Sequence, residues 1–139
     1  YVVVMSTINM FKKEMGLFCL NDKPTDEFIE NTTIDLFERI YRKAFNELYA
    51  MPEGDYIDIC YEEFCKDPKG HLKKIYEHLG LEGYDRALPY LQKYLDSQKN
   101  YKKNHFELSD ELREKINSRL GFYFEHYGYQ MQTDKREVV

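Results

Sequence analysis

One strand-like segment among helical ones is the feature that most constrains the fold of this 139-residue sequence. Residues 55–61, DYIDICY, are short, alternating and rich in β-branched and aromatic side chains, which predicts a strand. An isolated strand leaves unpaired backbone groups along both edges, and the sequence offers no convincing partner strand. We therefore expect the partner strands upstream of Tyr1. The apolar start without an initiator Met likewise indicates a truncated sequence.

The remaining periodic segments have the spacing of helices. Residues 2–15 fit a strand or a helix by periodicity, but their Met, Lys and Glu content favours a helix that Gly16 ends. Residues 26–50 repeat apolar side chains at helical intervals, and Thr25 is in position to cap them. We predict one long amphipathic helix there.

Three further helices are expected in the second half of the sequence. Asp67 and Pro68 have the residue types of a helix cap and a first helical position, and Gly80 stops that helix. Residues 84–95 form the next one, which Pro89 bends or delays. The last begins near Ser109 and runs into a cluster rich in aromatic residues.

Composition excludes several classes of function. The 25 acidic and 20 basic residues give a net charge of −5, which argues against nucleic-acid binding by the whole chain. No apolar run approaches the ~18 residues of a membrane span. The three cysteines lack CxxC spacing and the four histidines form no HxxxH or HExxH pattern, so we predict neither a disulfide framework nor a metal site. A reducing, cytoplasmic location is the expectation from the cysteines.

The segment after the predicted strand carries a family resemblance. Residues 60–68, CYEEFCKDP, precede a helix that closes on Leu79-Gly80-Leu81. This run resembles the sulfotransferase pattern of a strand ending in Tyr-Glu-Asp, an apolar residue, Asp-Pro, and a helix closing on a Leu-Gly turn. Glu63 stands where that family usually has Asp, a change that keeps the carboxylate.

Two other regions extend the resemblance over nearly the whole chain. Residues 1–10 look like the family helix that follows a strand ending in Arg-Asn-Pro and carries a serine, here Ser6. Residues 101–104, Tyr-Lys-Lys-Asn, and the closing Tyr-Gly-Tyr of 127–129 are similar to bacterial-type members. Residues 1–139 are thus expected to be the C-terminal part of a single sulfotransferase domain, with 130–139 as a frayed tail.

The resemblance implies a fold and a reaction. The implied fold is α/β, a P-loop-like three-layer architecture whose C-terminal part is mostly helical with about one clear strand. The implied donor is 3′-phosphoadenosine 5′-phosphosulfate (PAPS), which sulfates a hydroxyl or amine without a metal. The acceptor class, a small molecule, sugar or lipid, stays open, and the sequence carries no signal for an oligomeric state. The glycine-rich loop of the family has no counterpart in these residues.

The cofactor-binding candidates follow from the same resemblance. Ser6 would donate to the 3′-phosphate, and Tyr61 would lie against the adenine ring. A basic loop, to which Lys99 adds charge, would close over the phosphates, and its candidate ligands are Tyr101, Lys102, Lys103 and Asn104. Each has a plainer interpretation: a helix serine, a core tyrosine and a solvated charge run. We expect Glu62 to be structural.

The catalytic base is unassigned, because the family takes its base and loop lysine mainly from residues upstream. His105 is adjacent to the lysine loop, but only in sequence. Two alternatives stay open. Another P-loop transferase, such as a nucleotide kinase, would share the layout. A helical interaction module would instead bind a partner through Phe122, Phe124 and Tyr127, and would tolerate alanine at Ser6 and in the lysine loop.

Overall fold

The structure is a computed structural model that describes residues 1–18, 22–98, 102 and 105–133. These residues form six helices, and no strand occurs among them. The chain divides into two compact units. The first comprises Tyr1–Phe45 and Lys103–Val139, and the second comprises Asn46–Lys102.

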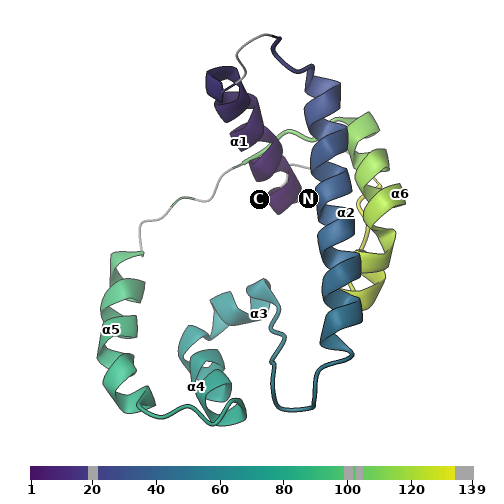
Figure 1. Cartoon of the computed structure of the whole chain (residues 1–139). Coiled ribbons are helices and arrows are strands. Elements are labelled where there is room, and N and C mark those ends of the chain that lie inside the picture. Colours follow the sequence, from purple (N-terminus) through teal and green to yellow (C-terminus); the bar gives the residue numbers. More distant parts are fainter. Residues whose placement is uncertain (19–21, 99–101, 103–104, 134–139) are drawn as a thin grey trace. The chain divides into compact units, whose positions relative to one another are not determined.

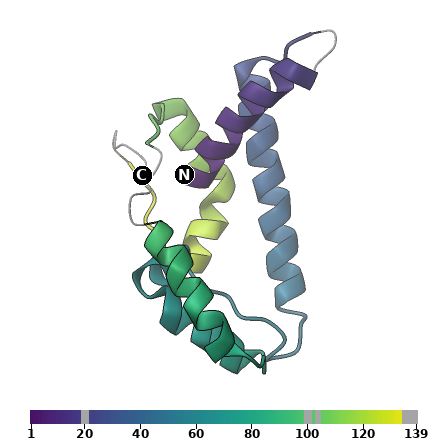
Figure 2. The same ribbon diagram turned by 90° about the vertical axis from the view of Figure 1, so that its left-hand side faces the viewer.

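Three helices build the first unit: α1 (Val2–Phe18), α2 (Asp26–Leu48) and α6 (Asp110–Tyr127). Each contributes apolar side chains to one core. Figures 1 and 2 show how the backbones of these three helices are arranged. The buried apolar residues of this core are Val4, Met5, Ile8, Ile29, Ile34, Leu108, Leu112, Ile116, Leu120 and Phe124. Burial of these side chains is the main stabilising contribution to the unit.

Local capping explains where these helices begin and end. The Thr25 hydroxyl accepts from Phe28 N–H at 3.2 Å, and the Ser109 hydroxyl accepts from Leu112 N–H at 3.2 Å. The predicted cap at Thr25 is therefore confirmed. Ser109, near which the last helix was predicted to begin, caps α6 in the same way. Gly128 ends α6 in the left-handed conformation with φ of 68°, which glycine adopts without a Cβ penalty. The predicted stop at Gly16 is wrong, because α1 continues to Phe18.

The second unit holds α3 (Tyr61–Lys66), α4 (Pro68–His78) and α5 (Tyr84–Ser97). α4 packs against α5, where the Tyr84 hydroxyl donates to the Lys69 carbonyl over 3.2 Å. Pro89 lies inside α5 without delaying its start. None of the described side chains of this unit is buried, so its apolar residues are half-buried or exposed.

The predicted fold class is wrong for this chain. Residues 55–60 form neither helix nor strand, and the short helix α3 follows directly after them. The physical reason is that a strand needs a neighbouring strand to satisfy its backbone hydrogen bonds, and no other described segment supplies one. The Tyr56 carbonyl instead lies 2.8 Å from His78 Nε2 of α4. The described residues are helical rather than three-layer α/β.

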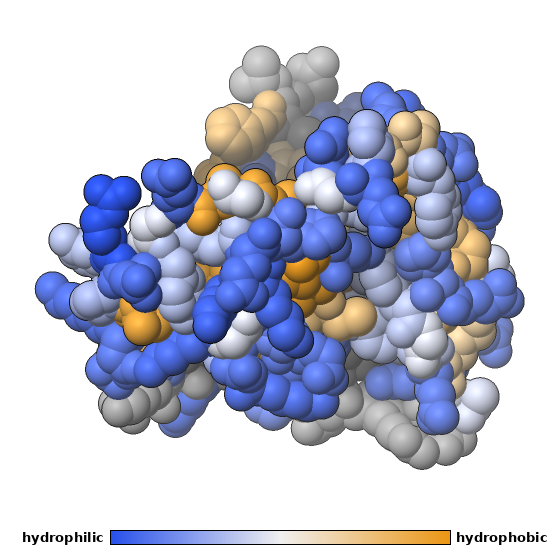
Figure 3. All heavy atoms as spheres, turned by 90° about the horizontal axis from the view of Figure 1, so that it is seen from below, coloured by the Kyte–Doolittle hydropathy of each residue, from blue (hydrophilic) through white to orange (hydrophobic). Residues whose placement is uncertain are grey.

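The surface is mostly polar, as the charged fraction of 32% leads one to expect. On the face seen in Figure 3, hydrophilic residues cover most of the area and apolar residues show between them in patches. α1 nevertheless exposes apolar side chains at seven-residue intervals, Val3, Met10 and Leu17. No helix among the described residues is long and apolar enough to cross a membrane.

Candidate functional site

Ser6 lies on the exposed side of α1. The opposite side of the same turns carries Val4, Met5 and Ile8, which are buried in the core of the first unit. Within the described part of the chain, the Ser6 hydroxyl has no hydrogen-bond partner, whereas its neighbour Thr7 donates to the Val3 carbonyl over 2.9 Å. The Ser6 hydroxyl is therefore available for an external acceptor such as a phosphate oxygen.

Tyr61 is the first residue of α3 and belongs to the second unit. Its side chain is 65% exposed, so it does not fill a core. Cys60 precedes it with extended backbone angles and makes no side-chain cap. The aromatic ring is accordingly accessible for stacking, at the start of a helix rather than at the end of a strand as predicted.

The acidic residues after Tyr61 build the turn from α3 into α4. Lys66 Nζ donates to Glu63 Oε1 over 2.6 Å, and this hydrogen bond holds the pKa of Glu63 below its ordinary value of 4.5. Asp67 then caps α4, with its Oδ1 accepting from Gly70 N–H at 2.9 Å. The Asp67 carbonyl oxygen lies 2.9 Å from His71 Nδ1. The motif that carries the resemblance thus shapes a corner between two helices.

The lysine loop is described only in part. Lys102 is exposed and, among the described residues, has no hydrogen-bond or ion-pair partner. The other predicted ligands, Tyr101, Lys103 and Asn104, lie outside the described residues, as does Lys99. Their roles stay predictions. After the loop, His105 is exposed and Phe106 packs against the core of the first unit.

The candidate residues are distributed over both units. Ser6 belongs to the first, and Tyr61 and Lys102 belong to the second. The structure therefore describes the surroundings of each residue separately and does not bring the three together. Among the described residues there is no group of three or more His, Cys, Asp or Glu side chains that could hold a metal ion.

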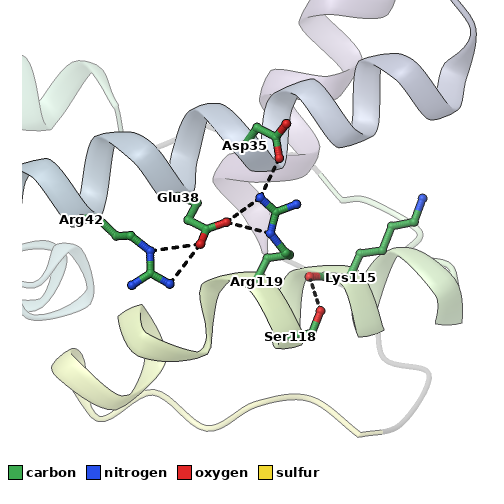
Figure 4. A network of polar contacts seen from close by, with 6 residues as sticks. All are labelled: Asp35, Glu38, Arg42, Lys115, Ser118 and Arg119. Atoms are coloured by element: carbon green, nitrogen blue, oxygen red, sulfur yellow. Dashed lines mark hydrogen bonds and ion pairs between the residues drawn. The ribbon is translucent and has the colours of Figure 1, made fainter.

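An ion-pair network between α2 and α6 was not predicted from the sequence. Arg119 of α6 contacts Asp35 Oδ1 at 2.6 Å and Glu38 Oε2 at 2.5 Å, and Arg42 pairs with the other oxygen of Glu38 at 3.0 Å (Figure 4). Hydrogen bonds lower the pKa of Glu38, and the one from Arg119 has a larger effect than the one from Arg42. The four-residue spacing of Glu38 and Arg42 could have predicted their ion pair from the sequence. The sequence contains no such signal for the pairing with Arg119, which is far away along the chain.

The C-terminal aromatic residues pack within the first unit. Phe124 is buried with its ring 5.1 Å from that of Tyr1, and Phe122 and Tyr127 are half-buried. Phe45 of α2 lies 6.0 Å from the Phe122 ring and 5.8 Å from the Tyr127 ring. Phe122 and Tyr127 therefore serve the contact between α2 and α6, and Phe124 serves the contact with Tyr1 at the start of α1.

Comparison with known proteins establishes the family. The model of the sulfotransferase family matches residues 1–86, which is more than half of the chain. The chain belongs to the sulfotransferase family, and the resemblance drawn from residues 60–68 is confirmed.

The similar relatives are much longer than this chain. It is 30% identical over 133 residues to the omega-hydroxy-beta-dihydromenaquinone-9 sulfotransferase Stf3 of Mycobacterium bovis, and equally to that of Mycobacterium tuberculosis. The alignment covers 96% of this chain and 34% of each relative, so the chain spans about a third of their length. No solved structure matches the chain.

Proposed function

We propose that this chain is the C-terminal part of a sulfotransferase that takes its sulfuryl group from PAPS. The family match over residues 1–86 is the observation that carries the proposal. The two relatives support it, because both are named as sulfotransferases and align with 96% of the chain. The cytoplasmic location inferred from cysteine usage belongs to the same proposal.

In the proposed reaction, the acceptor oxygen attacks the sulfur of PAPS, and the bond from sulfur to the 5′-phosphate oxygen breaks. The acceptor proton leaves to a base, and 3′-phosphoadenosine 5′-phosphate (PAP) is the second product. Such transfers depend on placement and on positive charge near the leaving phosphate. We assign no base among the described residues.

The proposed nucleotide contacts are those of Ser6, Tyr61 and the lysine loop. Ser6 would donate to the 3′-phosphate, which is supported by an exposed hydroxyl without a partner among the described residues. Tyr61 would stack on adenine, which its 65% exposure allows. Lys102 would approach the phosphates as a point charge, together with Lys103. Tyr101 and Asn104 complete the proposed loop.

The proposed acceptor is a hydroxyl group on a lipid-like molecule. The names of both relatives give omega-hydroxy-beta-dihydromenaquinone-9 as the molecule they act on. Of the acceptor classes that the sequence left open, a small molecule, a sugar or a lipid, this proposal selects the lipid. Sulfation of a panel of lipid and sugar alcohols by the full-length protein, followed by mass spectrometry, tests the choice, and transfer to sugars alone would contradict it.

Calorimetry of PAP binding to the full-length protein tests the nucleotide site. We expect the Ser6→Ala, Lys102→Ala, Lys103→Ala variant to lose about 2–5 kcal/mol of binding free energy. Each charge-assisted hydrogen bond contributes about 1.5–3 kcal/mol, and the losses are not fully additive. Lys74→Ala, which removes an exposed lysine of α4, is the matched control and should bind as the wild type does.

Competition with ATP separates the alternatives. PAP binding that ATP does not displace and that the triple variant loses supports the sulfotransferase site. Tight ATP binding would favour a nucleotide kinase instead. Failure of both nucleotides to bind folded protein would favour an interaction module, although the packing of Phe124 in the core leaves that alternative fewer exposed aromatic residues.

A further inference from the structure

Tyr1, Asn117 and Gln132 form a closed set of hydrogen bonds in the first unit. The Tyr1 hydroxyl donates to Asn117 Oδ1 and accepts from the Gln132 backbone N–H at 2.8 Å. Asn117 Nδ2 in turn donates to the Gln132 carbonyl over 3.0 Å. Each residue thus bonds to the other two. The set ties together the start of α1, the middle of α6 and the segment that follows α6.

The same tyrosine determines how α1 begins. Its carbonyl accepts from Met5 N–H at 2.9 Å, which is the first backbone hydrogen bond of the helix. Its ring lies against Phe124, with the two centroids 5.1 Å apart. Tyr1 is therefore held through its backbone, its ring and its hydroxyl, and Ser6 follows directly after the residue that closes the first turn.

Farther along α1, Phe11 and Met15 pack against the core, and ion pairs join the helix to α2. Lys12 pairs with Asp26 at 3.0 Å and with Glu30 at 3.7 Å. The Asp26 side chain is 73% exposed, and exposed ion pairs of this kind contribute little to holding a helix in place. The part-buried hydrogen bonds of Tyr1 therefore hold α1 more firmly than the ion pairs of Lys12 do.

We propose that Tyr1 is a positioning residue, which acts through its hydroxyl on the contact between Ser6 and the 3′-phosphate. By joining α1 to Asn117 and Gln132, it fixes the orientation of the first turns of α1 and with it the direction of the Ser6 hydroxyl. A binding side chain must be held to within about 0.5 Å to contribute its full hydrogen bond. This inference rests on the proposed function, because it requires that Ser6 contacts the 3′-phosphate.

Tyr1→Phe in the full-length protein is the direct test. The substitution keeps the ring against Phe124 and leaves Asn117 and the Gln132 N–H without their common partner. Calorimetry is run with two probes: PAP, and adenosine 5′-phosphate, which lacks the 3′-phosphate. We expect Tyr1→Phe to lower PAP affinity on the order of 3- to 30-fold, as coupled neighbouring groups do. Affinity for adenosine 5′-phosphate should stay within about twofold.

The ratio of the two affinities distinguishes positioning from stability, because general loosening would weaken both nucleotides alike. Glu38→Gln, which removes the ion pairs of Glu38 with Arg119 and Arg42 in the same unit, is the control and should leave the ratio unchanged. If Tyr1→Phe does not fold, Asn117→Ala removes the Tyr1–Asn117 bond, together with the Asn117–Gln132 bond, and leaves Tyr1 intact. An unchanged ratio in a folded variant overturns the inference alone. A wild-type protein that binds neither nucleotide overturns the proposed function as well.

Discussion

Arg119 Nε of α6 donates to Glu38 Oε2 of α2 over 2.7 Å and so joins two helices whose residues lie 81 positions apart in the sequence. Glu38 is the centre of the network, because Arg42 Nε also donates to its other oxygen at 3.0 Å. Arg42 lies in addition over the Phe122 ring, 4.2 Å from its centroid. The polar contacts between the two helices therefore continue into the aromatic ones.

This network predicts a pH-dependent contribution to stability. Arg119 and Arg42 lower the pKa of Glu38 below its ordinary value of 4.5. A carboxyl group with a lowered pKa in the folded state stabilises the protein above its unfolded pKa, and the contribution disappears as the pH falls through the folded value. We expect Glu38→Gln to lower Tm at pH 7 by at most about 3 °C, since the partners are partly exposed.

Thermal unfolding followed by circular dichroism checks this, with Tm compared at pH 7 and well below pH 4.5. The difference between wild type and Glu38→Gln should shrink at low pH, and also at pH 7 in 1 M salt. Glu114→Gln, an exposed glutamate on the helix that carries Arg119, is the control and should show neither effect. A difference that persists at low pH would assign the loss to packing instead.

The core of the first unit gives a second prediction. Ile116 of α6 is 0% exposed, and Ile40 of α2 is 49% exposed. Ile116→Ala should therefore cost about 2–5 kcal/mol of unfolding free energy, because it leaves a cavity that the surroundings fill only partly. The same change at Ile40 should cost less than about 1 kcal/mol. Urea unfolding measures both, and equal losses would mean that Ile40 is covered by another part of the protein.

A third prediction concerns the cap of α4. A Cβ added at Gly70 would lie 2.0 Å from Asp67 Oδ2, so the capping side chain occupies the space that alanine needs. Asp67→Ala should cost about 1 kcal/mol through loss of the cap. Gly70→Ala should be neutral or destabilising in the wild type, because it displaces that carboxylate.

In the Asp67→Ala background the sign should change. Gly70→Ala is then expected to stabilise the helix by about 0.5–1 kcal/mol, the usual advantage of alanine over glycine in a helix. A double-mutant cycle from urea unfolding measures the coupling. Additive effects would show that Asp67 and Gly70 do not compete for the same space.

Most helices could be predicted because their signals are local. The residue types and periodicity at Thr25, Asp67 and Ser109 place the starts of α2, α4 and α6. The predicted caps Thr25 and Asp67 are confirmed, and so is the helix start near Ser109. The strand prediction for 55–61 was wrong because a strand depends on neighbours that local sequence does not contain. The short helix α3 was missed for the same reason, since its Tyr-Glu-Glu start was interpreted as the end of a strand.

The family could be predicted from the spacing of residues 60–68, whereas the geometry of the site could not. Spacing identifies Ser6 and Tyr61 as candidates, but their exposure depends on which side of each helix faces a core. The contacts of Tyr1 with Asn117 and Gln132 link residues more than a hundred positions apart. No periodic pattern encodes such a pair.

The last prediction tests the adenine contact of Tyr61. Its ring is 65% exposed, so Tyr61→Ala should leave the stability nearly unchanged. If the ring stacks on adenine, the loss of PAP affinity should be about 1–3 kcal/mol, as for other stacked bases, and Tyr61→Phe should retain most of the affinity. Tyr90→Ala is the matched control, because Tyr90 is 77% exposed on α5 in the same unit and has no proposed contact. Calorimetry with the full-length protein gives the affinities. Equal binding by Tyr61→Ala and Tyr90→Ala would remove Tyr61 from the nucleotide site and leave Ser6 and the lysine loop as its proposed ligands.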